Sequence, residues 1–301
     1  MQEKIPEFLW KMLVEQYGEE LAGKITDGYV AERAVTLRVN RLKTTPDEIK
    51  GQLTQAGIAY ESVPWSEDAL VIRGVREDAV RNIHSYETGG IYLQSLSSMM
   101  PPLCLDPKPK ECILDMAAAP GGKTTQMAAL SENRAQITAC EKNKVRSERL
   151  KYNLERQGAS CALVMVEDAR KLDDFFSFDK ILLDAPCSGS GTLAVGPQGV
   201  TAKFTKELIA RSAKTQEELL KKALRLLKPG HEMIYSTCSI LEAENEKSLK
   251  KILGKQAEIV PLDEGLFPGV TYLPVSIPGT LCICPDEQYE GFFVAKIRKR
   301  G

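Results

Sequence analysis

From Glu111 onward, short apolar runs alternate with longer amphipathic segments. The apolar runs predict buried strands at residues 112–116, 136–141, 162–166, 180–183 and 233–236. Apolar side chains at helical spacing predict helices between them at residues 124–130, 145–157 and 205–227. Beyond these we expect a helix near residues 242–253 and strands at residues 280–284 and 292–297. The alternation predicts βα units around a mainly parallel sheet, and therefore an α/β fold.

The first hundred residues predict a smaller α+β module. Apolar side chains between Ile5 and Tyr17 follow a helical period. Residues 34–40 and 69–73 have the pattern of strands, and residues 46–57 that of a helix. Prolines between residues 101 and 109 block a continuing helix and are interpreted as the link to the second part. We therefore expect an N-terminal domain at residues 1–100 and a second domain at residues 101–301.

The charge balance alone does not indicate a partner. Lys and Arg number 40 against 41 Asp and Glu, for a formal net charge of −1. A nucleic-acid surface would therefore have to be local. The two candidate basic clusters are Arg33, Arg38, Arg41 and Lys43, and Lys296, Arg298, Lys299 and Arg300. An ordinary solvated face explains either cluster equally well.

Eight cysteines occur without an export signal or an apolar run long enough to cross a bilayer. We therefore expect a cytoplasmic, monomeric protein with reduced thiols and no membrane partner. Cys282 and Cys284 are one residue apart, and no second cysteine or histidine pair completes a zinc site. We expect no metal.

The segment from Asp115 to Thr124 places Ala-Pro-Gly-Gly between a strand and a helix. Small residues and a helix amino terminus let a nucleotide-like cofactor approach the backbone. A phosphate-binding P-loop is disfavoured, because Ala117 occupies the position where that motif needs glycine. An adenosyl cofactor fits the set better. Its expected binding residues are Ala117, Ala118, Ala119, Pro120, Gly121, Gly122, Lys123, Glu141, Arg146, Asp168 and Asp184.

Two acidic residues in that set follow the next strands. Glu141 lies 20 residues past Gly121, where a carboxylate can bind the hydroxyls of a ribose. Asp168 follows the third strand and could accept the exocyclic amine of an adenine. The alternative for Glu141 is a surface residue that caps the following helix.

Two cysteines follow strands of the same sheet. Cys187 lies in Asp184-Ala-Pro-Cys-Ser-Gly and Cys238 in Ser236-Thr-Cys-Ser. The carboxyl ends of parallel strands meet at one edge, so two thiols and the Asp184 carboxylate are expected in one cleft. This combination indicates covalent catalysis on a base. The alternative is two small buried cysteines and a turn in which Asp184 satisfies backbone amides.

These motifs together resemble the NOP/Sun-type RNA (cytosine-5) methyltransferases. The matching segments are residues 36–43, 94–99, 115–124, 184–191, 236–239 and 291–295. The resemblance implies a Rossmann-like, seven-stranded methyltransferase sheet that binds S-adenosylmethionine, behind an N-terminal module similar to an RNA-recognition fold. It also implies an RNA substrate. We expect tRNA first and rRNA second.

The resemblance also implies catalytic roles. Cys238 would add to carbon 6 of the cytosine. Asp184, with Lys123 beside it, would hydrogen-bond to or protonate ring nitrogen 3. Cys187 would assist release of the Cys238 thiol after methyl transfer. DNA enzymes place their nucleophile at the Pro-Cys position, which leaves the reverse assignment open. A non-catalytic RNA-binding scaffold is the alternative from another class. Relatives carry a basic stretch after Gly191, whereas this chain has no charge until Lys203.

Overall fold

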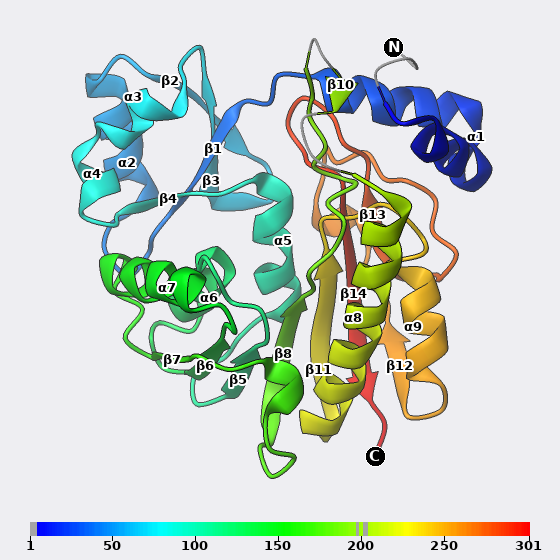
Figure 1. Cartoon of the computed structure of the whole chain (residues 1–301). Helices are drawn as coiled ribbons and strands as arrows, with labels where there is room; N and C mark the ends of the chain where they lie inside the picture. The colour runs from blue at the N-terminus through cyan, green and yellow to red at the C-terminus, as the bar shows by residue number, and fades with distance from the viewer. Residues whose placement is uncertain (1–4, 197–198, 201–203) are drawn as a thin grey trace.

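A computed structural model describes residues 5–196, 199–200 and 204–301 of the chain (Figure 1). Pro197 and Gln198 of the uncharged stretch, and Lys203 after it, lie outside the described residues. The described strands form a four-stranded sheet, an eight-stranded sheet and a two-stranded ribbon. The ribbon pairs β9 (Val195–Gly196) with β10 (Gly199–Val200). None of the described helices is long and apolar enough to span a bilayer.

The eight-stranded sheet has a parallel centre in the order β7-β6-β5-β8-β11. These strands are β5 (Cys112–Asp115), β6 (Gln136–Cys140), β7 (Ala162–Met165), β8 (Phe178–Asp184) and β11 (Leu227–Thr237). Antiparallel to β11 lies β14 (Phe292–Lys299), which also pairs with β12 (Ala257–Val260) and β13 (Leu281–Ile283). The predicted Rossmann-like sheet is confirmed. The sequence did not predict β12, a short edge strand without a continuous apolar run.

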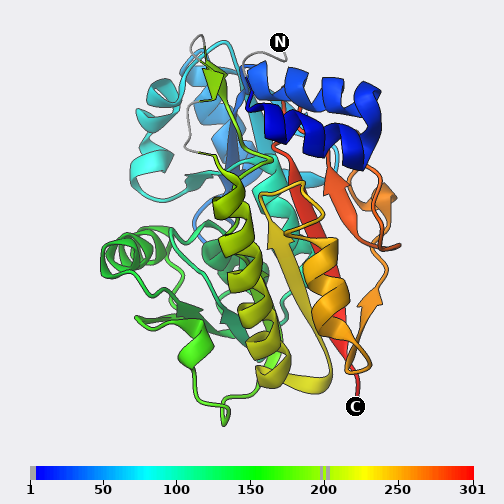
Figure 2. The ribbon, with the colours of Figure 1, turned by 45° about the vertical axis from the view of Figure 1, so that its right-hand side comes forward.

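Helices cover both faces of this sheet (Figures 1 and 2). Helix α6 (Gly122–Leu130) follows β5, and helix α7 (Lys144–Gln157) follows β6. In Figure 2, α8 (Lys206–Leu226) and α9 (Glu246–Leu253) lie side by side in front of β11 and β14. Helix α8 begins where the Thr205 side chain accepts a hydrogen bond from the Leu208 amide, a typical N-cap. Its buried stripe joins the main core through Leu220, Ala223 and Leu224.

The first helix, α1 (Glu7–Val30), packs on the larger sheet's side of the molecule. Leu9 and Leu13 belong to the same buried cluster as Tyr235 and Phe293. The Tyr17 hydroxyl donates to the Ile240 carbonyl. Helix α1 is therefore anchored beside the segment that follows β11.

The four-stranded sheet is antiparallel along β2-β3-β1-β4. Its strands are β1 (Val35–Val39), β2 (Ala59–Val63), β3 (Ser66–Arg73) and β4 (Ile91–Leu93). Three helices accompany them, α2 (Pro46–Gln55), α3 (Glu77–Arg81) and α4 (His84–Glu87). Helix α2 starts with a capping box between Thr45 and Glu48. The predicted N-terminal α+β module is confirmed, and it has its own small core around Leu37, Ile49 and Leu70.

The proline segment differs from the prediction. Pro101 and Pro102 lie inside helix α5 (Leu96–Leu105), which is buried against the larger sheet. Proline removes the amide that would bond to the carbonyl four residues earlier. For Pro102 that carbonyl belongs to Ser98, and the Gln94 side chain donates to it at 3.1 Å instead. A side chain thus replaces the missing helical bond. The division at residues 100 and 101 remains a proposal.

Neither basic cluster of the sequence is an open cationic face. Arg38 is buried, and Arg41 pairs with Glu67 and Asp68. Near the end of the chain, Glu232 pairs with both Lys296 and Arg298. Glu232 lies opposite Arg298, at the end of β11 away from Cys238. The second cluster is therefore remote from the expected cleft.

Arg38 instead connects the small sheet to the first turn of α6. Its guanidinium donates to Gln94 Oε1 at 3.0 Å, to Thr125 Oγ1 at 2.9 Å and to the Gly122 carbonyl at 3.3 Å. It also lies 5.8 Å from the centre of the Tyr92 ring. Burial lowers the pKa of Arg38 to about 10, so the group stays charged near neutral pH. A buried cation with several acceptors fixes how β1 meets α6.

Arg38→Met should lower the free energy of unfolding by about 2–4 kcal/mol, because it leaves several buried acceptors without their charged donor. Arg41→Met, at an exposed ion pair, is the matched control and should cost no more than about 1 kcal/mol. Urea unfolding of both variants measures the two losses. Equal losses would contradict the role of Arg38.

Candidate active site

The two cysteines meet at the carboxyl ends of neighbouring strands. Strands β8 and β11 pair in parallel with Asp184 opposite Ser236, so the loops that follow them start side by side. The Sγ atoms of Cys187 and Cys238 are 3.0 Å apart. The hydrogen bond to Cys238, together with burial, holds the pKa of the Cys187 thiol well above its usual value. The structure therefore brings together the two thiols that the sequence predicted at one edge.

Close backbone packing fixes the loop that contains Cys187. The Gly191 amide donates to the Cys238 carbonyl at 3.0 Å, and the Gly291 amide donates to the Gly191 carbonyl at 2.8 Å. A Cβ atom at Gly191 would lie 1.9 Å from the Gly291 carbonyl oxygen. Only glycine permits this approach.

Asp184, at the end of β8, has a cation on one carboxylate oxygen and a hydroxyl on the other. Lys123 Nζ donates to Asp184 Oδ2 at 2.8 Å, and Ser236 Oγ donates to Oδ1 at 2.8 Å. Lys123 also donates to Ser98 Oγ at 2.7 Å and lies 5.3 Å from the centre of the Phe292 ring. Its side chain is only 13% exposed, so the ion pair is partly shielded from water. The predicted contact between Lys123 and Asp184 is present.

A second carboxylate, Asp115, is more deeply buried at the end of β5. Thr124 Oγ1 donates to its Oδ2 at 2.6 Å, and the side chain has 1% exposure. Burial raises the pKa of Asp115 to about 6, and the charge of Asp184 adds to this effect. The Thr124 hydroxyl and Lys123 ammonium are thus both bound to carboxylates, unlike the free groups of a P-loop.

Two neighbouring cavities lie along this edge of the sheet and share Ala117. The first, of about 200 Å³, holds Lys123 and Asp184. This first cavity is also lined by four further residues of the predicted cofactor set, Ala118, Ala119, Pro120 and Gly122. The second contains Glu141, Arg146 and Asp168 and has about 40 Å³. Within the predicted cofactor set, Gly121 is the one residue that lines neither of these two described cavities. It is the N-cap of α6, with φ at +108°.

Glu141 has the burial expected of a ligand-binding carboxylate. It is 4% exposed, so it is not the surface residue of the alternative. Its Oε1 accepts the Asn143 amide at 2.8 Å, and Oε2 lies 3.4 Å from a guanidinium nitrogen of Arg146. Arg146 in turn donates to the Ala119 carbonyl at 2.7 Å. Glu141 is therefore oriented by its neighbours toward the cavity.

Asp168 is less available than the sequence suggested. Both of its oxygens accept hydrogen bonds from the Arg170 guanidinium, one of them at 2.5 Å. These bonds lower the pKa of Asp168. Arg170 also pairs with Glu218 at 2.6 Å. Any ligand group would have to use the remaining lone pairs of the carboxylate.

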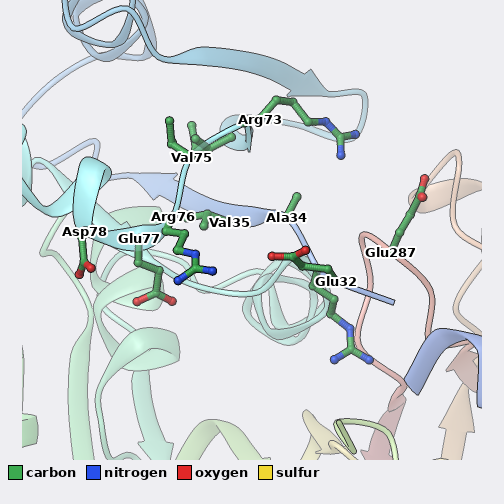
Figure 3. Close-up of a pocket in the computed structure, with 12 residues that line it drawn as sticks. Glu32, Ala34, Val35, Arg73, Val75, Arg76, Glu77, Asp78 and Glu287 are labelled. Atoms are coloured by element: carbon green, nitrogen blue, oxygen red, sulfur yellow. The ribbon is translucent and has the colours of Figure 1, made fainter. Parts of the chain in front are cut away.

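A larger hollow of about 800 Å³ lies elsewhere, between the small sheet and Glu287. Figure 3 shows that its labelled charged side chains have both signs, with Arg76 close to Glu77. Its described lining lacks the Lys123–Asp184 ion pair and the buried Asp115, which line the smaller cavity, and neither cavity has Cys187 or Cys238 among its lining residues. The smaller cavity beside Asp184 is therefore the better candidate for chemistry.

The sequence interpretation missed several side chains of the site. Tyr92, Gln94 and Ser98 line the cavity beside Lys123, although they come from β4 and α5. Ser236 contacts Asp184, and Glu244 contacts the loops of both cysteines. Gln94, Ser98 and Ser236 were within the matching segments, but their roles needed three-dimensional contacts. His231, by contrast, lies outside the site, with Nδ1 at 3.0 Å from the Asp179 carbonyl.

Comparisons with known proteins identify the family. The model of the 16S rRNA methyltransferase RsmB/F family matches residues 102–298, and a ferredoxin-like domain model of RsmF/B-like methyltransferases matches residues 5–77. The chain belongs to the RsmB/F methyltransferase family. The predicted resemblance to NOP/Sun-type methyltransferases is confirmed.

Named relatives agree with this assignment. A ribosomal RNA small subunit methyltransferase F from Shewanella amazonensis is 37% identical over 88% of this chain and 58% of the relative. A probable ribosomal RNA small subunit methyltransferase B from Bacillus subtilis is 33% identical over 98% of this chain and 66% of the relative. This RsmB/F family member thus spans less than two thirds of the length of either relative.

Solved structures support the same fold. A methyltransferase homolog from Pyrococcus horikoshii matches with a TM-score of 0.84 and 30% identity, over 98% of this chain and 95% of that one. NSun6 from Pyrococcus horikoshii, solved with SFG, matches over both full chains with a TM-score of 0.87 and 24% identity. The described residues of this chain contain no group of three or more His, Cys, Asp or Glu side chains arranged to hold a metal.

The buried Asp115 should make stability depend on pH. Its folded pKa of about 6 lies above the unfolded value of 3.8, so its contribution is fully present below pH 3.8 and is lost as pH rises through about 6. Relative to Asp115→Asn, the wild type should lose about 1–3 kcal/mol of unfolding free energy between about pH 4 and about pH 7.5. Urea unfolding at several pH values measures this difference. A pH-independent difference would contradict it, and Glu132→Gln at an exposed site is the control.

Proposed function

We propose that this protein is an S-adenosylmethionine-dependent RNA methyltransferase that modifies carbon 5 of a cytosine in small-subunit ribosomal RNA. The observation that carries the proposal is the pair of thiols 3.0 Å apart, on the two loops that follow the paired residues Asp184 and Ser236. A non-catalytic scaffold has no need of two thiols and an ion pair at one strand edge. The names of the relatives favour ribosomal RNA over tRNA, which the sequence pattern had put first.

The two adjoining cavities fit an adenosyl cofactor. Glu141 is buried at the end of β6, where its carboxylate can accept the ribose hydroxyls. Ala117 joins the two cavities, so the reactive end of the cofactor would face Asp184 and Lys123. The bound cofactor supplies an electrophilic methyl group. A Cβ atom on Gly122 would lie 3.1 Å from the Tyr92 ring, so the cavity wall is tightly packed at this glycine.

Cys238 is assigned as the nucleophile. Carbon 5 of cytosine is unreactive until a thiolate adds to carbon 6 and makes carbon 5 electron-rich. As the sulfur–carbon bond forms, charge builds on ring nitrogen 3. The Asp184 carboxylate, held by the Lys123 ammonium, can take the proton that the Cys238 thiol gives up and pass it to that nitrogen. Carbon 5 then takes the methyl group.

Cys187 is assigned to the resolution of the adduct. Carbon 5 must lose its proton to a base as the bond between carbon 6 and the Cys238 sulfur breaks. The departing sulfur then needs a proton. Cys187 is in hydrogen-bond contact with that sulfur and passes its own proton to it, and the Cys187 thiolate that remains takes the carbon-5 proton; the raised pKa makes this thiolate a stronger base. The reverse assignment would give Cys238 this role.

Cys238→Ala should abolish methyl transfer while binding of the cofactor survives, because the ring is no longer activated. Cys187→Ala should instead accumulate a covalent protein–RNA adduct. Labelled cofactor with unmodified small-subunit rRNA or tRNA, nucleoside mass spectrometry for 5-methylcytosine and denaturing gels measure these outcomes.

Cys161→Ala, remote from the site at the start of β7, is the matched control and should keep full activity. Normal turnover by Cys238→Ala would refute the mechanism. An adduct in Cys238→Ala but not in Cys187→Ala would establish the reverse assignment. Transfer to tRNA alone would refute the ribosomal substrate.

Glu141→Ala should weaken binding of S-adenosylmethionine by about tenfold or more, because the ribose hydroxyls lose a buried charged acceptor. Titration calorimetry measures the affinity. Glu148→Ala, on the exposed side of α7 where it pairs with Lys151, should leave binding unchanged. An unchanged affinity in Glu141→Ala would refute the proposed orientation of the cofactor.

A further inference from the structure

A fully buried carboxylate, Glu244, lies between the two cysteine loops. Its exposure is 0%, and no Lys, Arg or His within the described ranges forms an ion pair with it. Burial raises the pKa of Glu244. A buried charge without a cation is costly unless hydrogen bonds satisfy it. The donors around Glu244 therefore indicate what it does.

The Glu244 carboxylate contacts the residue after each cysteine. Its Oε1 accepts the Ser188 amide at 2.7 Å, and its Oε2 accepts the Ser188 hydroxyl at 2.5 Å. Oε2 also accepts the Ser239 hydroxyl at 2.6 Å. Ser188 follows Cys187 and Ser239 follows Cys238. One carboxylate thus bonds to both loops, immediately next to both thiols.

Neighbouring contacts keep Glu244 itself in place. The Tyr235 hydroxyl donates to the Glu244 carbonyl at 2.6 Å, and the Asn245 amide group donates to the Ser239 carbonyl at 2.8 Å. These contacts explain why α9 begins at Glu246, later than residue 242 as the sequence predicted. Residues 244 and 245 bond back to the loop after β11 instead of joining the helix.

We propose that Glu244 is a positioning residue that holds the loops of Cys187 and Cys238 together so that their thiols meet. Its catalytic meaning rests on the proposed function, but the geometry it maintains does not. Hydrogen bonds to a charged acceptor are stronger than neutral ones, which suits a link between two loops from different strands. The charge of Glu244 also contributes to the raised pKa of Cys187.

The bridge has a chemical requirement that a conservative variant can meet. The Ser188 amide must find an acceptor, whereas the two serine hydroxyls can either donate or accept. In Glu244→Gln, the amide oxygen can take the place of Oε1 and the NH₂ group can donate to the hydroxyls. Glu244→Ala provides neither. The two variants therefore separate the bridge from the negative charge.

The test is the rate at which diamide joins Cys187 to Cys238 in the full chain. The two thiols lose two protons and two electrons to diamide, which is reduced to its hydrazine, and a disulfide forms. Mass spectrometry of peptides identifies this disulfide among the eight cysteines. The assay needs neither RNA nor cofactor, so it reads the geometry even if the proposed function fails.

We expect Glu244→Ala to slow this reaction by about tenfold or more, since the two loops lose the side chain that bonds to both of them. Glu244→Gln should stay within about threefold of the wild type, and methyl transfer should follow the same order. A wild-type rate in Glu244→Ala would overturn the proposal. A rate as slow in Glu244→Gln as in Glu244→Ala would also overturn it, because charge rather than bridging would then be responsible.

Glu246→Ala is the matched control. Glu246 is also buried, but its carboxylate accepts the Ser276 amide and contacts neither cysteine loop in the described structure. It should form the disulfide at the wild-type rate even if its melting temperature falls. If Glu244→Ala does not fold, the double variant Ser188→Ala and Ser239→Ala replaces it. That variant should be slowed as well, and a wild-type rate would overturn the bridge.

Discussion

The parallel pairing of β8 with β11 is the constraint on which the site depends. It sets Asp184 opposite Ser236, and the two loops that leave these strands carry one thiol each. The two cysteines are 51 residues apart in the sequence, yet their thiols meet because the strands that precede them are neighbours in the sheet. Because both strands run in the same direction in the centre of the sheet, their carboxyl ends are fixed relative to each other by backbone hydrogen bonds.

Three carboxylates near this edge have three different environments. Asp184 has the Lys123 ammonium and a serine hydroxyl, Asp115 has a threonine hydroxyl, and Glu244 has two serines. Burial raises the pKa of both Asp115 and Glu244. Identical chemical groups thus differ in how readily they carry a charge. In the mechanism that we propose, one sheet edge thereby combines proton transfer, support of the cofactor turn and alignment of the loops.

The N-terminal module takes part in the site and is not only an appendage. Arg38 from β1 contacts the first turn of α6, and Ser98, in helix α5 that follows the module, contacts Lys123. Tyr92 and Gln94 line the same cavity as Asp184. A substrate bound in this cavity would therefore touch both sheets. The buried position of Arg38 means that its role is to join the sheets and not to attract RNA.

The sequence by itself determined the strands of the larger sheet and their succession along the chain, apart from β12, and the residues at the carboxyl edge of the sheet. Apolar runs and the Pro-Gly and Pro-Cys turns are local signals, so Cys187, Cys238, Asp184 and Lys123 could be named without coordinates. Only the tertiary structure decided the rest, because it depends on which distant groups meet. Pro101 and Pro102 fit inside a helix since Gln94 serves the freed carbonyl, and Arg38 is buried since its acceptors come from other elements. The tertiary structure likewise decided the position of Glu244 between the two cysteine loops, because its donors come from loops that only the paired strands bring together.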